Sequence, residues 1–600
     1  MRDILLPVTS SRFTQSATTA SLLPVRSTRQ PRAGWWATCL LLLSCLLWLS
    51  PSVGKAAEVD EQVRQREQER IETIRRIAPS VVAIFAPEGK GGGSGVVVSP
   101  DGFVVTNFHV VQGLGNFMKC GLNDGELYDA VIVGIDPTGD VALIRLLGRD
   151  DFPTAEIGNS DEVRVGHWVY ALGNPFLLAN DFQPTVTYGM VSGVHRYQEP
   201  AGTFLEYTDC IQVDASINPG NSGGPLFSAD GKLIGINGRI SVESRGRVNV
   251  GAGYAISINQ VMNFLDHLKS GRVVDHATLG ATATSTSDGS VVISNILERS
   301  DAYRQGLRSG DELVSFAGRP VRSVNQYKNI LGIYPKGWTL PLSFRREGER
   351  HDLRVQLMAL HRTAELRPEQ PKQPQGPLPL PIPGHEPKEP EAPDEFAHFY
   401  EDRVGFANYY FNRIRQEELL AMLASWGDFS DRKGLWTLGG QDAAGKSFEF
   451  KLSPDVAASR IGNDFAIQPL EEDFADQPPG TGGLLAALVQ WKHLLVDPAD
   501  YFTEFYYLGS EPFEGVGPRV DVLITTKGLV TTRWYFDRER STMIGFDTSI
   551  SEDMFPCEVR LGDQVAPDLP ALPIQWTIRF GDRVIGPLTM TDFRFESQAE

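Results

Sequence analysis

Three short segments of the sequence carry a histidine, an aspartate and a serine, in that order, within residues 106–226. A serine hydroxyl is a poor nucleophile at neutral pH. It needs a base within hydrogen-bond reach and a third group that holds the base in the correct tautomer. These residue types in this order predict nucleophilic catalysis. We assign Ser222 as the nucleophile, His109 as its base and Asp140 as the carboxylate that orients the base.

Glycines surround the predicted nucleophile in the segment Gly-Asn-Ser-Gly-Gly-Pro of residues 220–225. Gly220 lacks a Cβ where the backbone must turn, so the N–H groups of Gly220 and Ser222 can point at one developing oxyanion. Such a donor pair contributes about 3 kcal/mol of transition-state stabilisation. Gly223 and Gly224 then permit close packing of the backbone behind the nucleophile.

Taken one at a time, these features have simpler interpretations. His109 could be an ordinary partly buried histidine, and Asp140 has equally acidic neighbours in Asp136 and Asp150. The glycine run of residues 89–95 could bind a phosphate, but a phosphate loop requires Lys-Ser/Thr at the start of a helix. Here the run leads into three consecutive valines, so nucleotide binding is excluded. A complete triad in an inactive protease core remains the alternative to catalysis.

The segments around the triad resemble those of the HtrA (Deg) family of extracytoplasmic serine proteases, which have a trypsin-like fold. The resemblance covers about residues 79–268 and rests on the segments 93–107, 136–144, 171–176, 186–193, 217–222 and 253–256. It implies a mainly β, multidomain chain in which residues 79–271 form a double six-stranded β-barrel, with the triad between the barrels. It also implies an oxyanion hole made by the amides of Gly220, Asn221 and Ser222.

The residues expected around the S1 pocket favour a neutral pocket of modest volume. A protease that cuts after Lys or Arg needs a buried carboxylate at the pocket base, but the position six residues before the nucleophile holds Ser216. As in HtrA proteases, this predicts a preference for small or medium aliphatic side chains. The expected substrate-binding residues are Ser216, Ile217, Asn218, Val250, Gly251, Ala252 and Gly253.

Length and composition describe the rest of the chain. Six hundred residues predict three or more domains. The net charge of −19 argues against nucleic-acid binding, which requires a basic face, and is sufficiently explained by solubility. Outside the leader the cysteines are Cys120, Cys210 and Cys557, an odd number that builds no disulfide framework. Since no Cys/His cluster has metal-ligand spacing, we expect neither a metal nor a cofactor.

Residues 1–57 are typical of a targeting segment. Arg26, Arg29 and Arg32 precede a short apolar run over 37–49, which suits a signal peptide better than a membrane span. Cleavage at the small residues of 54–56 would give a periplasmic or secreted protein, whereas an uncleaved leader would anchor it to the membrane. The polar stretch of 58–78 predicts a solvated helical spacer, or a contact in an oligomer.

Residues 276–360 resemble the PDZ domain of HtrA proteins. The segment Gln305-Gly-Leu-Arg-Ser-Gly-Asp-Glu-Leu313 matches the domain's signature except at Gln305, where alanine is usual. PDZ domains bind a peptide along a sheet edge and capture its C-terminal carboxylate on backbone amides. By resemblance, that loop consists of Leu279, Gly280 and Ala281. The alternative is a rigid spacer whose groove is filled.

Ten prolines in residues 361–394 predict an extended linker, which makes the C-terminal domain of residues 395–600 a separate body. That domain begins with a helical stretch over 397–426. β segments over 520–525, 529–536, 542–546 and 575–580 then predict an antiparallel meander curled around an apolar interior. It faintly resembles a lipoprotein-carrier half-barrel. No catalytic motif occurs in it, so we expect adhesion, substrate recruitment or binding of a lipid-like ligand.

The sequence as a whole predicts an extracytoplasmic serine endopeptidase that degrades unfolded or misfolded proteins through an acyl-enzyme on Ser222. By resemblance it is a homo-oligomer, a trimer or a multiple of one, and its PDZ domain recognises C-terminal peptides. Two alternatives are a peptide-binding sensor or chaperone with an inactive protease core, and an enzyme that hydrolyses a small ester. Because His109 must be neutral to accept the serine proton, activity should rise from mildly acidic to neutral pH.

Overall fold

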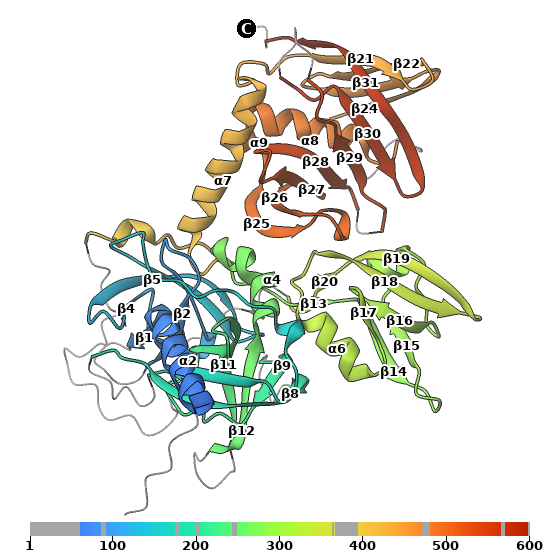
Figure 1. Ribbon diagram of the computed structural model, residues 1–600. Coiled ribbons are helices and arrows are strands. Elements are labelled where there is room, and N and C mark those ends of the chain that lie inside the picture. Colours follow the sequence, from blue (N-terminus) through green and yellow to red (C-terminus); the bar gives the residue numbers. More distant parts are fainter. Residues whose placement is uncertain are drawn as a thin grey trace, which may run out of the picture. The chain divides into compact units, whose positions relative to one another are not determined.

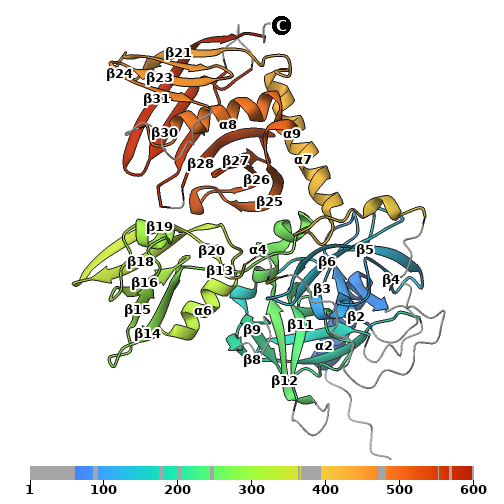
Figure 2. The ribbon, with the colours of Figure 1, turned by 180° about the vertical axis from the view of Figure 1, so that it is seen from behind.

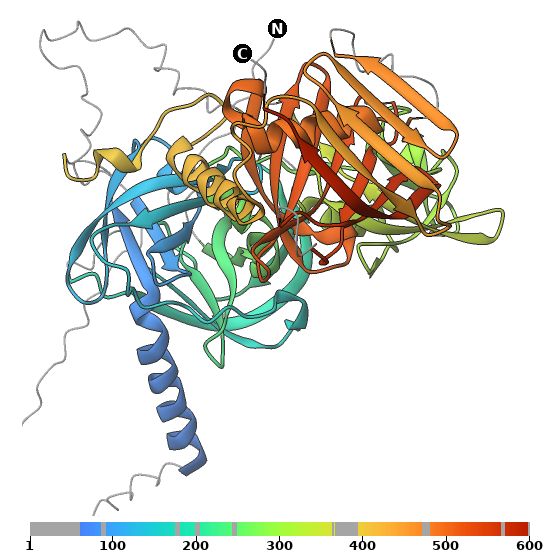
Figure 3. The same ribbon diagram turned by 90° about the horizontal axis from the view of Figure 1, so that it is seen from above.

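The computed structural model describes residues 61–85, 92–174, 181–198, 205–242, 249–362, 365–366, 394–470, 481–551, 553–565 and 571–597. The leader and most of the proline-rich linker lie outside these ranges. The chain divides into two compact units, residues 1–67 and 68–600. The helix expected over 58–78 is present as α2 (Glu61–Ile77), one unbroken helix in Figure 3. Among the described residues, no helix combines the length and apolar character needed to cross a membrane.

Residues 81–146 form the first closed β-barrel, with strand order β1-β2-β3-β6-β5-β4. Its antiparallel ladder closes where β1 pairs with β4. Strand β6 is buried over nearly its whole length, because one face fills the barrel and the other packs outside it. The six strands are β1 (Val81–Phe85), β2 (Gly92–Val97), β3 (Phe103–Thr106), β4 (Phe117–Gly121), β5 (Leu127–Asp136) and β6 (Val141–Leu146).

A second closed barrel follows, with strand order β10-β11-β12-β9-β8-β7 (Figure 1). One hydrophobic cluster contains residues of both barrels and of helix α4 (Ile258–Lys269), which follows the second barrel. The double six-stranded barrel implied by the resemblance is therefore confirmed. The strands are β7 (Trp168–Gly173), β8 (Thr185–Gln198), β9 (Tyr207–Val213), β10 (Pro225–Ser228), β11 (Leu233–Val242) and β12 (Asn249–Ser257).

Residues 277–359 form a smaller unit around one hydrophobic cluster. Its main sheet has the order β14-β15-β16-β18-β19, with β17 paired to β16, while β13 pairs with β20. Short strands and two helices make up this unit. They are β13 (Ala277–Thr278), β14 (Ala281–Ser285), β15 (Val291–Ile296), α5 (Asp301–Arg304), β16 (Glu312–Phe316), β17 (Arg319–Pro320), α6 (Val324–Gly332), β18 (Thr339–Arg346), β19 (Glu349–Gln356) and β20 (Met358–Ala359).

The C-terminal region is an antiparallel sheet of eleven strands, β24-β23-β22-β21-β31-β30-β29-β28-β27-β26-β25. The predicted curled meander is confirmed (Figure 2). The strands are β21 (Trp436–Asp442), β22 (Ser447–Leu452), β23 (Val456–Ile461), β24 (Asp464–Pro469), β25 (Glu504–Pro512), β26 (Arg519–Lys527), β27 (Val530–Asp537), β28 (Thr542–Ser549), β29 (Cys557–Leu561), β30 (Gln575–Phe580) and β31 (Arg583–Phe595).

Three helices accompany this sheet: α7 (Tyr409–Leu423), α8 (Leu484–Val496) and α9 (Pro498–Tyr501). The sheet curls around α8, which is buried on every face (Figure 1, Figure 2). Because α8 is mostly apolar and buries even Gln490 and Lys492, it lacks the 3.6-residue alternation of apolar and exposed polar faces that identifies an amphipathic helix, and sequence reasoning missed it. The helical stretch expected over 397–426 contains α7, flanked by two short 3-10 helices at 397–399 and 424–426.

The expectation that the C-terminal region is a separate body does not hold in this structure. Asn412 of α7 donates from Nδ2 to the carbonyls of Ser270 (2.7 Å) and Tyr507 (2.8 Å), so one amide joins the end of α4 to β25. Ser510 also donates to Asp266 of α4 at 2.6 Å. The proline-rich composition of the linker could not show these contacts, because they are made by residues outside it.

Candidate active site

His109 and Asp140 form a direct pair at the edge of the first barrel. His109 lies in the short helix α3 (Phe108–Val111), and Asp140 immediately precedes β6. The Nδ1 atom of His109 is 2.8 Å from Oδ2 and 3.0 Å from Oδ1 of Asp140, and the backbone N–H of His109 donates to Oδ1 at 3.0 Å. With a proton on Nδ1, the Nε2 atom keeps its lone pair for a serine proton.

The two side chains of this pair differ in their exposure to solvent. Asp140 is 1% exposed, whereas the His109 side chain is 46% exposed and open to an incoming group. Burial lowers the pKa of His109, but the hydrogen bond to Asp140 and the charge of that carboxylate outweigh burial, so the net pKa is raised above 6.5. His109 thus has the arrangement of a base held by its carboxylate.

A tight turn presents Asp140, whose φ of 57° lies in the left-handed region. Oδ1 of Asp136 accepts the backbone N–H groups of Thr138 (3.1 Å) and Gly139 (2.8 Å) inside that turn. The other Asp136 oxygen is 2.8 Å from Nε2 of the buried His276. Asp136, the acidic alternative within the turn, is therefore engaged in holding the turn, which explains why Asp140 is the partner of His109.

Ser222 lies in the loop that enters β10, beside the start of β2. Its carbonyl accepts the N–H of Ser94 at 2.9 Å, and a Cβ on Gly93 would meet Val110, the neighbour of His109. The nucleophile loop and the histidine thus lie against the same strand. The Oγ atom of Ser222 donates to the carbonyl of Gly238 at 3.4 Å. Among the described residues, no hydrogen bond joins this Oγ to His109.

The turn before Ser222 presents two free backbone donors. Gly220 has a φ of 105°, and its carbonyl is held by the Ser94 hydroxyl at 2.7 Å. The N–H groups of Gly223 and Gly224 donate to Asn237 and Asn221 carbonyls at 2.8 and 3.0 Å. In the described part of the chain, the N–H groups of Gly220 and Ser222 have no hydrogen-bond acceptor. This is the pair that the sequence singled out.

Asn221 departs from the expected oxyanion set. Its N–H donates at 2.9 Å to the carbonyl of Asn218, closing the turn that places Gly220 in the left-handed region. The amide of Asn221 is therefore not available to an oxyanion. The resemblance included the whole run from Gly220 to Ser222, but a tight turn of this kind uses the middle amide internally.

The residues expected to line the S1 pocket differ in how exposed they are. Ser216 is exposed, Asn218 is half-buried, and the carbonyl of Ser216 accepts the Thr187 hydroxyl at 2.9 Å. Ile217 is fully buried against Gly253, so it supports the wall from behind rather than facing a substrate. Ala252 is half-buried in β12, while the burial of Val250 and Gly251 lies outside what the structure describes.

The loop expected to capture a peptide carboxylate is engaged within the chain. The Leu279 side chain is buried in the core of the smaller unit. Gly280 donates its N–H to the Thr278 hydroxyl at 3.1 Å, and the carbonyl of Ala281 accepts the Tyr327 hydroxyl at 3.2 Å. A peptide that paired with β14 at this point would meet an N–H and a carbonyl that already have partners within the chain.

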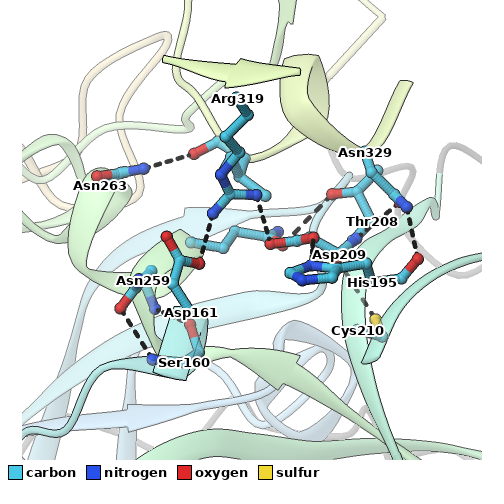
Figure 4. A network of polar contacts seen from close by, with 12 residues as sticks. Ser160, Asp161, His195, Thr208, Asp209, Cys210, Asn259, Asn263, Arg319 and Asn329 are labelled. Carbon is cyan, nitrogen blue, oxygen red and sulfur yellow. Dashed lines mark hydrogen bonds and ion pairs between the residues drawn. The ribbon is translucent and has the colours of Figure 1, made fainter. Parts of the chain in front are cut away.

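A polar cluster missed by the sequence joins the second barrel to the smaller unit (Figure 4). The buried carboxylate of Asp209 lies 2.6 Å from Nδ1 of His195 and accepts Arg319 at 3.0 Å. Arg319 also donates to Asp161 at 2.6 Å. No local pattern marks these residues, because they are far apart in the sequence and meet only in the fold.

Comparison with known proteins agrees with this geometry. A family model described as "Trypsin-like peptidase domain" matches residues 93–236, which include all three triad residues. The chain carries a trypsin-like peptidase domain and is homologous to the DegP/HtrA endoproteases. The DegP/HtrA resemblance stated from the sequence is thereby confirmed.

Two relatives of this DegP/HtrA-like chain illustrate the similarity. "Probable periplasmic serine endoprotease DegP-like" of Chlamydia muridarum is 37% identical over 268 residues, which cover 43% of this chain and 52% of that protein. "Periplasmic serine endoprotease DegP" of Escherichia coli is 36% identical over 278 residues, covering 44% and 56%. The chain spans about half the length of the curated relatives it matches.

Solved structures that resemble the chain include "HtrA-type protease AlgW with decapeptide". It is 26% identical, with a TM-score of 0.39, and the match covers 49% of this chain and 99% of that one.

Proposed function

We propose that this protein is a serine endopeptidase that hydrolyses unfolded or misfolded proteins through an acyl-enzyme on Ser222. The observation that carries the proposal is the His109–Asp140 pair, with 2.8 Å between Nδ1 and Oδ2, next to a loop whose Gly220 and Ser222 amides are free. These are the groups that peptide-bond hydrolysis by a serine requires. Position 216 holds a neutral serine where a protease that cuts after Lys or Arg needs a carboxylate, which supports a preference for uncharged side chains at the cleavage site.

The chemistry follows from these positions. In the proposed mechanism, the Ser222 Oγ leaves the Gly238 carbonyl and gives its proton to Nε2 of His109 as Oγ attacks the peptide carbonyl. The negative charge on the carbonyl oxygen is then held by the amides of Gly220 and Ser222. Imidazolium at His109 is stabilised by Asp140 and returns the proton to the leaving amine. Water repeats the sequence to release the acyl group.

Substrate class, location and assembly are part of the same proposal. The relatives' names contain "periplasmic" and "endoprotease", which supports action on proteins outside the cytoplasm. We propose that residues 1–57 direct export and that the protein forms a trimer or a multiple of one. We also propose that residues 276–360 form a PDZ domain that recognises peptides, and that residues 395–600 recruit substrates.

Digestion of a disordered protein tests the proposed activity. Full-length wild type and Ser222→Ala are incubated with casein, and each cleavage site is read by mass spectrometry. Ser228→Ala is the matched control, because Ser228 lies on β10 and, among the described residues, its hydroxyl bonds to the Asp230 side chain and the Lys232 backbone. We expect cuts after small or medium aliphatic residues in wild type and Ser228→Ala, and none in Ser222→Ala. Absence of cleavage by the folded wild type would instead support a peptide-binding protein with an inactive core.

A further inference from the structure

A tyrosine hydroxyl contacts the catalytic carboxylate from the second barrel. Tyr207, the first residue of β9, is 2% exposed and donates to Oδ2 of Asp140 at 2.5 Å. The same oxygen is 2.8 Å from Nδ1 of His109. Because the two donors share one oxygen, the tyrosine competes with the histidine for the charge on that carboxylate.

The same hydroxyl also lies beside β11, the strand whose Gly238 carbonyl contacts the nucleophile. A Cβ built on Gly238 would be 2.8 Å from the Tyr207 hydroxyl oxygen, so only glycine leaves room for the ring. The carbonyl of Gly238 is the acceptor of the Ser222 hydroxyl. Tyr207 therefore packs between the Asp140 carboxylate and the backbone that positions Ser222.

The two residues that follow Tyr207 in the chain are held by hydrogen bonds and ion pairs. The Thr208 hydroxyl donates to Gln260 of α4 at 3.3 Å. Asp209 is held through its carboxylate by His195 and Arg319, and through its N–H by Asn329 at 2.9 Å (Figure 4). A side chain whose backbone is held in this way approaches Asp140 with little freedom, which is what precise placement of a hydrogen bond needs.

We infer that Tyr207 is a positioning residue of the catalytic machinery: its hydroxyl fixes the Asp140 carboxylate and moderates how strongly that carboxylate holds a proton on His109. The inference rests on the proposed function. The other titratable groups beside the Asp140 turn are Asp136 and His276, which pair with each other, and Glu206, whose N–H donates to Thr138 within that turn. None of them changes in the variants used below.

The direction of the effect follows from electrostatics. Without the tyrosine donor, the charge of Asp140 is shared with one partner fewer and attracts the imidazolium of His109 more strongly. Phenylalanine keeps the ring and its packing, so Tyr207→Phe removes the hydroxyl alone. We expect the pKa of His109 to rise by about half a unit to one unit in this variant. The loss of a hydrogen bond to a charged group should lower kcat/KM about tenfold at neutral pH.

Two readouts on the full-length protein test the inference. Exchange of the imidazole C2 hydrogen, followed by mass spectrometry, gives the titration midpoint of His109 without any need for activity. The pH profile of kcat/KM on an unstructured peptide gives the second midpoint. Tyr170→Phe is the matched control, since Tyr170 is another buried tyrosine of the second barrel, on β7.

We expect both midpoints to move to higher pH in Tyr207→Phe and to stay at the wild-type value in Tyr170→Phe. Unchanged midpoints in Tyr207→Phe would overturn the inference, even if the variant lost activity or stability, because a purely structural tyrosine would produce only those losses. If the wild type had no peptidase activity, the proposed function would fail, and the His109 titration alone would decide the role of Tyr207.

Discussion

The side-chain amide of Asn329 accepts a hydrogen bond of 2.9 Å at its Oδ1 from the backbone N–H of Asp209. Its Nδ2 donates to the carbonyl of His195 at 2.7 Å. Both residues of the second barrel have left-handed backbone angles, with φ of 51° at Asp209 and 54° at His195. One buried amide of α6 thus holds two backbone positions that non-glycine residues rarely adopt.

Asn329→Ala should destabilise the protein, because the Asp209 N–H and the His195 carbonyl would lose their partner in a buried place. The expected loss in free energy of unfolding is about 1–3 kcal/mol, the cost of leaving such groups unpaired. Denaturant unfolding of the full chain measures it. Asn325→Ala, on the exposed side of the same helix, should change little. Equal losses in the two variants would contradict the role given to Asn329.

The His195–Asp209 pair should make stability depend on pH. The hydrogen bond to Asp209 raises the pKa of His195 above 6.5 despite partial burial of the ring. A histidine whose pKa is higher in the folded than in the unfolded protein contributes its stabilisation fully below the unfolded pKa, and loses it as the pH rises through the folded pKa. His195→Gln should therefore lower the free energy of unfolding more at about pH 5.5 than at about pH 8.5. A loss that is the same at both pH values would exclude this pair as the source.

The pH profile of peptidase activity should report His109. Since Asp140 raises its pKa, the ascending limb of kcat/KM should have its midpoint above 6.5, the ordinary histidine value. Initial rates on an unstructured peptide between about pH 5 and pH 9 measure this limb. A midpoint below 6.5, or a flat profile, would show that His109 is not the base.

Gly223→Ala should abolish most activity by displacing the nucleophile loop. A Cβ at Gly223, where φ is 83°, would lie 2.2 Å from both the Ser94 carbonyl and the Thr106 hydroxyl. We expect kcat/KM to fall by about 100-fold or more, since the adjacent oxyanion donors move with the loop. Gly148→Ala is the control: its φ of 100° is equally unusual, but no atom lies within 4 Å of the added Cβ. Similar activity losses in both variants would mean that backbone strain alone is responsible.

The residues assigned to this candidate site from the sequence are recognised by local patterns. His109, Asp140 and Ser222 each lie in a short segment whose pattern is set by neighbours in the chain, and the strands next to these segments are rich in strong β-forming residues. The hydrogen bond from the Asn221 N–H to the Asn218 carbonyl was missed, because the family resemblance assigned all three amides of the loop to the oxyanion hole. The full burial of Ile217 was missed because it depends on packing against Gly253 in another strand.

Contacts between distant segments were beyond sequence reasoning. Tyr207 is separated from Asp140 by 67 positions, and Asn329 from Asp209 by 120, and no spacing rule connects such pairs. The same limit applies to α8 in the C-terminal region, which is mostly apolar, buried on nearly all sides and without a clear periodic pattern. Residues whose partners are remote are found by structure alone.

Covalent labelling of the nucleophile tests the proposed peptidase most directly. The full-length protein is treated with a fluorophosphonate, which reacts with an activated serine, and the adduct is located by peptide mass spectrometry. We expect one adduct on Ser222, formed faster as the pH rises through the pKa of His109, and strongly slowed in His109→Ala. A folded protein that remains unlabelled at Ser222, or is labelled there equally fast without His109, would contradict the assignment of an active triad.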